Sequence, residues 1–314
     1  MPAGSATVII PTHKRPQMLR NLLKSLCSQR GAGFEVIVVN DGSGGDLGDL
    51  QIEFSDIAVR VIDLPRSRGR AFARNEGVRN SGGELLIFVD DDMTVVDDFV
   101  ASHLESASGP RRVVIGDVQS PPEFKSHPLA RYIERQGVRK LRSREKIPPK
   151  CVRTGNLGVP RALFDEIGMF DEDISRYGED LDLGVRLAEA GAEFVFDPRA
   201  ISYHNHPPDL DDMVDKMQEF GRYTIPHLVA RHPGIARVLR VDLADPVRPF
   251  AESPDLSLKK AALRVVLTPP CYRIARWLYR RRGLGSLLFP VIDYIRAYNY
   301  IRGYRQARGQ SRSS

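Results

Sequence analysis

Residues 85–92, with the sequence LLIFVDDD, decide the fold class and the place of the chemistry. Five consecutive apolar residues are typical of a short strand that is buried on both faces of a parallel sheet. Three aspartates follow at once, so three carboxylates are expected where the strand ends. Because ligands of open α/β sheets bind beyond the carboxyl ends of the strands, the sequence predicts a polar site at this sheet edge.

The chain before this stretch alternates strand and helix patterns. Short apolar runs predict strands at 6–11, 34–40 and 59–64. Helical spacing predicts helices from about residue 16 and at 71–79. This alternation predicts an α/β fold with a mostly parallel central sheet flanked by helices. Thr12 and Asp41 directly follow the first two predicted strands, so we expect both to lie beside Asp90.

The second half mixes short strands with helices and ends in a helical extension. Strands are predicted at 113–118, 153–159, 194–197 and 201–204. Helices are predicted at 126–144, 180–190 and 210–229, and from 256 with a break at Pro269-Pro270. We expect four parts: a nucleotide-binding half at 1–120 and an acceptor-side half at 121–230, which together form a catalytic domain, then a linker at 231–257 and a basic helical extension at 258–314.

The composition is that of a globular protein. Hydrophobic residues make up 42% and charged residues 27% of the 314 residues, which excludes a disordered chain and a collagen-like fibre. No run of eighteen apolar residues occurs, so a spanning helix is not expected. The three cysteines lie far apart, which argues against a disulfide framework and favours a reducing, cytoplasmic location.

Positive charge is concentrated at the C-terminal end. The net charge is +6, but residues 259–314 hold thirteen Lys and Arg and one acid, Asp293. Such a tail favours an anionic partner, a lipid surface or nucleic acid, and a solvated helical face is the alternative. Apolar residues recur there at helical spacing: Leu284, Leu287, Leu288, Val291, Ile292, Ile295 and Tyr298. We expect this stripe to dock peripherally on the inner face of the membrane, or to pack on the catalytic domain or a second subunit.

Three clusters of charged residues suggest chemistry. Asp90, Asp91 and Asp92 repel one another unless a cation compensates them, so a divalent ion is expected, with an acidic helix cap as the alternative. Glu179 and Asp180 precede an apolar helical stretch and suit either proton acceptance or helix capping. Arginines surround the start of the helix near residue 70 and suit either a diphosphate or solvent: Arg66, Arg68, Arg70 and Arg74.

Four segments together resemble a known family. They are TVIIPTHKRPQMLRNLLKSL at 7–26, EVIVVNDGS at 35–43, GRAFARNEGVRNSGGELLIFVDDDM at 69–93 and TGNLGVPRALFDEIGMFDEDISRYGEDLDLGVRLAEAG at 154–191. In this order and spacing they resemble the family-2 inverting glycosyltransferases with a GT-A fold, over about residues 6–206. The resemblance implies transfer of a sugar from a nucleotide-sugar donor to a hydroxyl of a glycan or lipid-linked acceptor.

The resemblance also implies roles for individual residues. It places at the nucleotide sugar Pro11, Thr12, Arg15, Asp41, Arg70, Arg74, Asp90 and Asp91. Asp41 would accept a hydrogen bond from the base, and Arg70 and Arg74 would approach the base or diphosphate. Mn²⁺ or Mg²⁺ would be bound by Asp92, Asp90 and His204.

On the acceptor side the resemblance makes Asp180 the general base and Glu179 an acceptor contact. A metal-dependent nucleotidyltransferase also places aspartates and a metal beside phosphates, and the basic tail allows a nucleic-acid-binding protein. Glu179 and Asp180, which follow the aspartates in the family's order, favour sugar transfer, and no nucleic-acid partner is expected.

Overall fold

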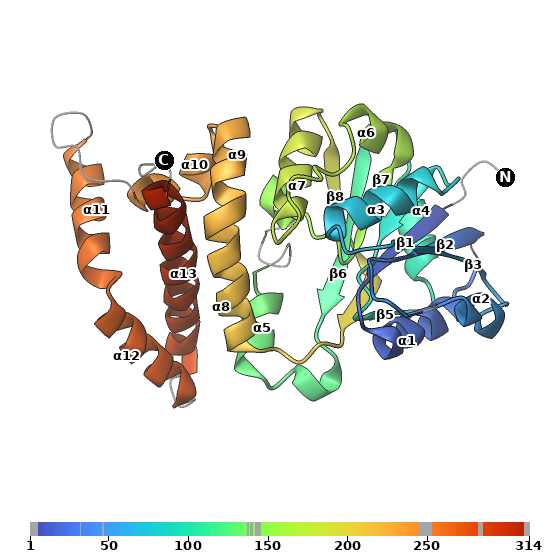
Figure 1. The fold of residues 1–314 in the computed structure, drawn as a ribbon, viewed down its shortest axis with the longest axis horizontal. Helices are drawn as coiled ribbons and strands as arrows, with labels where there is room; N and C mark the ends of the chain where they lie inside the picture. Colours follow the sequence, from blue (N-terminus) through green and yellow to red (C-terminus); the bar gives the residue numbers. More distant parts are fainter. Residues whose placement is uncertain are drawn as a thin grey trace. The chain divides into compact units, whose positions relative to one another are not determined.

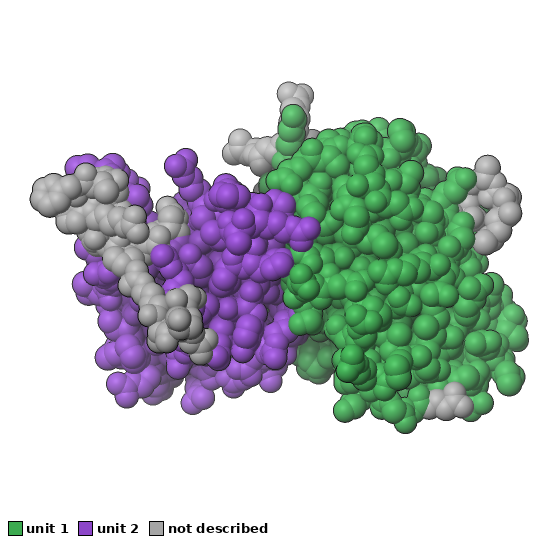
Figure 2. All heavy atoms as spheres, turned by 45° about the horizontal axis from the view of Figure 1, so that its top comes forward, with its two compact units in different colours: residues 1–126, 133–175, 179–207 green, residues 127–132, 176–178, 208–314 purple. Residues whose placement is uncertain are grey.

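A computed structural model describes residues 6–31, 33–45, 47–136, 138, 141, 146–244, 253–281 and 285–310. It confirms the α/β class and the helical C-terminal extension. The chain divides into two compact units, which Figure 2 colours green and purple. The first unit comprises 1–126, 133–175 and 179–207, and the second comprises 127–132, 176–178 and 208–314.

A sheet of eight strands forms the centre of the first unit within the described residues, in the order β3-β2-β1-β4-β7-β6-β8-β5 (Figure 1). Its strands are β1 (Ala6–Thr12), β2 (Phe34–Asn40), β3 (Ala58–Asp63), β4 (Leu85–Phe88), β5 (Met93–Val95), β6 (Arg112–Gln119), β7 (Leu157–Pro160) and β8 (Glu193–His204). The half from β3 to β4 is parallel, as predicted. Beyond β4 the sheet is mixed, because β7 runs antiparallel to both of its neighbours and β5 runs antiparallel to β8.

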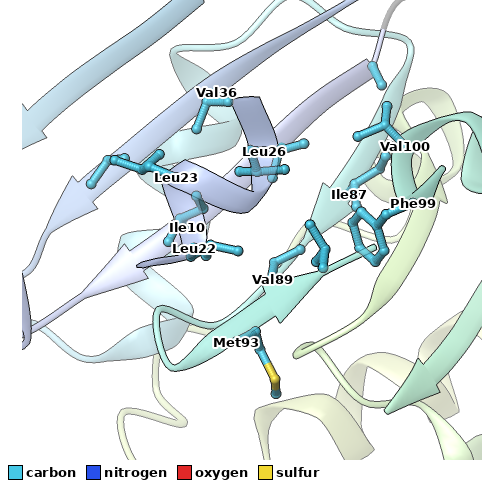
Figure 3. Close-up of a cluster of buried hydrophobic side chains, with 14 of the residues drawn as sticks. Ile10, Leu22, Leu23, Leu26, Val36, Ile87, Val89, Met93, Phe99 and Val100 are labelled. Atoms are coloured by element: carbon cyan, nitrogen blue, oxygen red, sulfur yellow. The ribbon is translucent and has the colours of Figure 1, made fainter. Parts of the chain in front are cut away.

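Two apolar layers cover the faces of this sheet. The helices of the first unit include α1 (Pro16–Cys27), α2 (Asp49–Glu53), α3 (Arg70–Arg79), α4 (Phe99–Ser106), α6 (Arg161–Glu166) and α7 (Glu179–Glu189). Val8 and Ile10 of β1 pack in one cluster with α1 and α4, part of which is shown in Figure 3. Ile9 packs in the opposite cluster with residues of α3, α6 and α7. This alternation is the two-residue period of a strand that is buried on both faces.

Three local predictions needed correction. The strands predicted at 194–197 and 201–204 form one strand, β8, which pairs with β6 across a register shift at Gly116/Asp117. The helix predicted at 126–144 is α5, which spans Pro128–Glu134, and residues 137, 139–140 and 142–145 lie outside the described residues. The strand β5 was not predicted, because a three-residue run after the aspartates is too short to show a period.

The second unit is helical. Its elements are α8 (Leu210–Glu219), the π-helical turn η4 (Phe220–Thr224), α9 (Ile225–Arg231), α10 (Ile235–Val238), the 3₁₀ turn η5 (Val241–Ala244), α11 (Pro254–Val266), α12 (Pro269–Arg280), the 3₁₀ turn η6 (Gly285–Leu287) and α13 (Leu288–Gln310). The predicted break at Pro269-Pro270 is confirmed as the start of α12. Among the helices that the structure describes, none has the length and apolarity to cross a bilayer.

The apolar stripe of the tail is largely an internal face of the second unit. Leu288, Ile292, Ile295 and Tyr298 are buried and pack in clusters with residues of α5, α8, α9 and α12. Leu287 is exposed, and Leu284 lies outside the described residues. The stripe is therefore not a free membrane-binding face, which corrects that part of the expectation.

The compact units also differ from the predicted domain bounds. α8 lies in the predicted catalytic domain 1–230, but it packs on α13 and belongs to the second unit. The physical reason is its apolar face, because Leu210, Met213 and Val214 join the cluster around α13. The predicted linker 231–257 contains α10 and η5 within its described part.

Two glycines allow η4 and the end of α8 to approach α13 closely. A Cβ on Gly303 of α13 would clash with the carbonyl oxygen of Gln218, and one on Gly221 would clash with that of Tyr300. Both obstacles are backbone atoms, which cannot rotate away. Close contact of the two backbones is therefore possible only without side chains at these crossing points.

Substitution of Gly303 by alanine should destabilise the second unit. The added methyl group must push α13 away from α8, at a cost of about 1–3 kcal/mol of unfolding free energy. Gly309→Ala is the matched control, since a Cβ there meets open space in the same helix, and alanine is the better helix former. Urea unfolding monitored by circular dichroism measures both variants. Equal stability of the two would show that the close crossing is unimportant.

Candidate active site

The site lies where β1, β2 and β4 end. The parallel register places Thr12 opposite Asn40 and Ile9 opposite Phe88, so the residues that follow β2 and β4 meet the end of β1. The Thr12 hydroxyl donates to Asp91 Oδ2 at 2.7 Å. Pro11, the residue before it, is buried in the strand. The sheet edge thus brings together the polar residues that the strand pattern predicted there.

Each of the three adjacent carboxylates has its own donor. Asp90 Oδ1 accepts from Arg74 Nη2 at 2.7 Å, and Asp91 accepts from Thr12. Asp92 Oδ2 accepts from Arg15 Nη1 at 2.8 Å, and the same nitrogen lies 3.4 Å from Asp91 Oδ1. Separate cationic and hydroxyl partners offset the repulsion between neighbouring charges.

The environments of Asp91 and Asp92 separate their proton affinities. Burial raises the pKa of Asp91 to about 6, against the opposing effects of the Thr12 hydrogen bond and the Arg15 charge. Burial also disfavours the charge of Asp92, but His204 and Arg15 outweigh it and lower the pKa of this carboxyl below its usual range. Asp92 is therefore the more firmly ionised of these two buried aspartates.

Asp92 and His204 have the chemistry of metal ligands. Strand β5 pairs with β8 so that Met93 lies opposite His204, and His204 Nε2 lies 3.5 Å from Asp92 Oδ2. The other oxygen, Asp92 Oδ1, is buried without a hydrogen-bond partner. A carboxylate suits Mg²⁺ or Mn²⁺, and an imidazole is a common metal ligand. These two residues therefore fit a divalent ion that takes its remaining ligands from phosphates and water. Within the described part of the chain, no three His, Cys, Asp or Glu side chains form a complete metal site.

Arg74 connects the aspartate run to the acceptor-side pair. Its guanidinium is fully buried and donates from Nη1 to Glu179 Oε1, at 2.7 Å, as well as to Asp90. Burial opposes the charge, but Asp90 and Glu179 outweigh it and raise the Arg74 pKa. The predicted contact of Arg74 with the base or diphosphate is not supported by this placement, which suits a residue that positions two carboxylates.

Asp180 is the more accessible member of the acceptor-side pair. Its side chain is 15% exposed and lies 3.6 Å from Arg153 Nη1, whereas Glu179 is 4% exposed. Burial and the charge of Glu179 raise the Asp180 pKa to about 6, against the charge of Arg153. A carboxylate whose pKa lies near neutral pH suits proton acceptance. The helix-capping alternative accounts for part of its bonding, because Asp180 Oδ1 accepts from the Leu181 amide at 2.8 Å.

Asp41 organises the loop that leads into α3. Its carboxylate accepts from the Ser67 hydroxyl at 2.7 Å and from the amides of Arg68 and Gly69 at 2.7 and 3.0 Å. Gly69 has φ of 92°, a conformation that favours glycine. Asp41 is thus bonded to protein donors at both oxygens, and its predicted contact with a base would have to use the remaining lone pairs.

Arg70 begins α3 and is exposed to solvent. Crowding by the surrounding chain opposes its charge, but Asp90 and Glu179 outweigh this and raise its pKa. An exposed guanidinium at the start of a helix has the chemistry that the predicted diphosphate contact needs. Arg68 instead stacks on Phe72, 3.4 Å from the ring centre.

Sequence reasoning missed Arg153. It is the cation nearest to Asp180, and an isolated arginine before Thr154-Gly155 carries no pattern that marks it. Arg153 lies far from Asp180 in the sequence and meets it only in the fold, so no local signal could have found it.

Comparison with known proteins places this chain in a family. The model of glycosyl transferase family 2 matches residues 7–168, which include β1, the aspartate run and β7. The chain belongs to this family. It is a glycosyltransferase with a GT-A fold, and family membership favours sugar transfer over the nucleotidyl transfer that the carboxylates alone allowed.

Three relatives illustrate the similarity. YfnE of Bacillus subtilis, an uncharacterised glycosyltransferase, is 28% identical over 68% of this chain and 68% of its own length. The pre-mycofactocin glycosyltransferase of Mycobacterium tuberculosis is 30% identical over 72% of this chain, which spans about half, 48%, of that relative. The solved mannosyltransferase PcManGT of Pyrobaculum calidifontis has a TM-score of 0.63 at 17% identity and covers 98% of this chain and 87% of its own.

Removal of the Arg74 guanidinium should be costly to the fold. Arg74→Met leaves Asp90 and Glu179 without their shared cation, which should lower the unfolding free energy by about 3–5 kcal/mol. Arg74→Lys keeps the charge but cannot bond both carboxylates in the same way, so an intermediate loss is expected. Arg66→Met, at an exposed position in the loop before the same helix, should stay within about 0.5 kcal/mol of the natural protein. Chemical denaturation compares the three, and a small loss for Arg74→Met would contradict the bridge.

Proposed function

We propose that this enzyme transfers a sugar from a nucleoside-diphosphate sugar to an acceptor hydroxyl with inversion at the anomeric carbon. The observation that carries the proposal is the Arg74 bridge, which joins Asp90 of the aspartate run to Glu179. Asp180 follows Glu179 directly, so a base with raised pKa lies next to a residue that is tied to the donor-side carboxylates. A single displacement needs the base and the donor-side carboxylates to be held in one fixed arrangement, and it needs no covalent intermediate.

On the donor side, the nucleotide sugar would contact the ends of β1, β2 and β4, through Pro11, Thr12, Asp41, Asp90 and Asp91. Arg70 is exposed beside these residues and would bond the diphosphate, while Arg15 holds Asp92 in place. The exposed guanidinium stabilises negative charge where it grows on the leaving group.

We assign Mn²⁺ or Mg²⁺ to Asp92 and His204. The free Oδ1 of Asp92 supports this assignment, as does PcManGT, which was solved with GDP-Man and Mn²⁺. A bound divalent ion supplies positive charge to the leaving diphosphate. Asp90 would contribute to the same region from its place against Arg74.

On the acceptor side, Asp180 would take the proton of the attacking hydroxyl. Arg153 moderates its pKa and would orient the carboxylate. Glu179 is buried against Arg74, so we assign it the task of holding the start of α7 rather than a direct acceptor contact. The acceptor class that fits is a glycan or lipid-linked sugar in polysaccharide or glycolipid synthesis, with the enzyme in the cytoplasm and peripheral at the inner face of the membrane.

The direct test is product analysis with a panel of nucleoside-diphosphate sugars and Mn²⁺. Free nucleoside diphosphate with an inverted glycosidic linkage supports the proposal. Release of pyrophosphate would indicate nucleotidyl transfer, and a retained anomeric configuration would contradict inversion. A thermal-shift panel of nucleoside diphosphates narrows the base beforehand, because a bound ligand raises the melting temperature.

Asp92→Ala should abolish metal-dependent donor binding. Loss of this ionised ligand should cut turnover at least a hundredfold, on the order of 3 kcal/mol. Asp98→Ala is the control, since Asp98 is an exposed carboxylate six residues further along the chain. Steady-state kinetics over a range of Mn²⁺ concentrations measure both. Full activity of Asp92→Ala in EDTA would show that Asp92 does not bind a metal needed for the reaction.

Asp180→Asn should lower kcat by ~10²–10⁴ and leave donor affinity nearly unchanged. A base acts only when ionised, and burial raises the Asp180 pKa to about 6, so activity of the natural enzyme should fall as the pH drops below about 6. Arg153→Ala removes the cation that lowers this pKa, so the acidic limb should move to higher pH. Asp165→Asn, at an exposed carboxylate, controls for the substitution. An acidic limb that Arg153→Ala leaves in place would assign it to another group.

A further inference from the structure

Helices α11 and α12 expose apolar side chains that the packing of the second unit leaves uncovered. Ten large apolar side chains are exposed among the described residues, and six of them lie between residues 258 and 287. The six are Leu258, Val265, Val266, Ile274, Trp277 and Leu287. Trp277 is 53% and Val265 74% exposed. Such a concentration marks a surface with a partner.

The exposed apolar residues follow helical spacing. On α11, Leu258, Ala261, Ala262 and Val265 recur at intervals of three and four, and all are exposed. One face of α11 is therefore apolar and exposed to solvent. On α12, Ile274 and Trp277 lie three residues apart and are exposed, whereas Ala275 is buried toward α13. Figure 1 shows α12 alongside α13, and Ile274 and Trp277 stay exposed among the described residues.

Positive charge dominates this surface, and its two helices carry a single acid, Asp255, which pairs with Lys259 at 2.5 Å. Residues 256–292 contain no Asp or Glu. Five basic side chains are exposed on α11, on α12 and at the residue that follows α12: Lys259, Arg264, Arg273, Arg280 and Arg281. The Arg281 guanidinium lies 4.8 Å from the centre of the Trp277 ring. Of the other two basic residues on these helices, Lys260 is buried and Arg276 is paired with Asp211.

We infer that the solvent face of α11 and α12, which we call the α11–α12 surface, binds an anionic lipid surface. Arginines and lysines would contact the headgroups, and Ile274, Trp277 and Val265 would enter the interface below them. Each basic residue near an anionic surface adds a similar favourable contribution to the binding free energy. The four arginines Arg264, Arg273, Arg280 and Arg281 therefore suffice without a spanning helix. The inference rests on the peripheral location proposed above, but its test uses no sugar donor, so its failure leaves the sugar-transfer chemistry untouched.

Two other occupants fit the surface less well. Nucleic acid would satisfy the basic side chains, but it provides no hydrocarbon for the exposed Leu258 and Val265. A second copy of the chain would bring two surfaces of the same strong positive charge together, and like charges oppose such contact. An anionic bilayer supplies both negative charge and an apolar layer.

Trp277 reports directly on binding because it is the only tryptophan of the chain. Its emission should shift to shorter wavelength when the full-length protein is titrated with vesicles of phosphatidylcholine and phosphatidylglycerol. Pure phosphatidylcholine vesicles should give little shift, and 0.5 M NaCl should weaken the response, since salt screens the charges. Vesicles with brominated acyl chains should quench the emission if the ring enters the acyl region.

Two double variants separate the electrostatic and apolar parts. Arg273→Glu with Arg280→Glu should weaken vesicle co-sedimentation by roughly thirtyfold or more. The matched control is Lys24→Glu with Arg237→Glu, which makes the same change in net charge at exposed positions elsewhere. Ile274→Ser with Trp277→Ser should weaken it by roughly tenfold or more, and Ile52→Ser with Val238→Ser is the control at exposed positions outside the surface.

Several outcomes would overturn the inference. Equal binding to neutral and anionic vesicles would show that negative charge does not drive binding. Equal loss of vesicle binding in a variant and its control would show that binding does not depend on the α11–α12 surface. A blue shift of Trp277 with an oligonucleotide but not with vesicles would assign the surface to nucleic acid. A blue shift that follows protein concentration alone, together with a larger species in gel filtration, would assign it to self-association.

Discussion

Repulsion among three adjacent carboxylates is the constraint on which the site depends. Asp90, Asp91 and Asp92 stand at the end of a buried strand, where water can screen them only in part, so each needs a donor from the protein. The partners come from separate elements: Arg74 from α3, Thr12 from β1 and Arg15 from the turn before α1. Compensation of this charge therefore holds the elements of the nucleotide-binding half around one point.

Arg74 extends this constraint to the acceptor side. A fully buried guanidinium is tolerated only when its charge is matched, and here the match requires both Asp90 and Glu179. The start of α7 is consequently fixed with respect to the aspartate run, and with it Asp180. Burial raises the pKa of Asp91 and of Asp180 to about 6, whereas His204 and Arg15 outweigh burial and lower that of Asp92. Residues of the same type thus suit different tasks.

The second unit divides the apolar residues of the tail between two uses. α13 turns its stripe inward against α5, α8 and α12, and its one acid, Asp293, accepts from the Tyr132 hydroxyl, to which Arg296 also donates at 2.7 Å. α11 and α12 keep apolar side chains in solvent among basic ones. The sequences of α11, α12 and α13 all predict basic, amphipathic helices. Periodicity shows that a helix face is apolar but not what covers it.

The α/β class, the parallel half of the sheet, the break at Pro269-Pro270 and the family could all be predicted from the sequence. They depend on local period, proline chemistry and ordered motifs. Three features became visible only in the folded chain: Arg74 is buried between Asp90 and Glu179, Arg153 faces Asp180, and α8 packs with α13. These features are contacts between residues far apart in the chain. Local patterns cannot encode them, since a charged or apolar side chain acquires its role from the partner that folding brings to it.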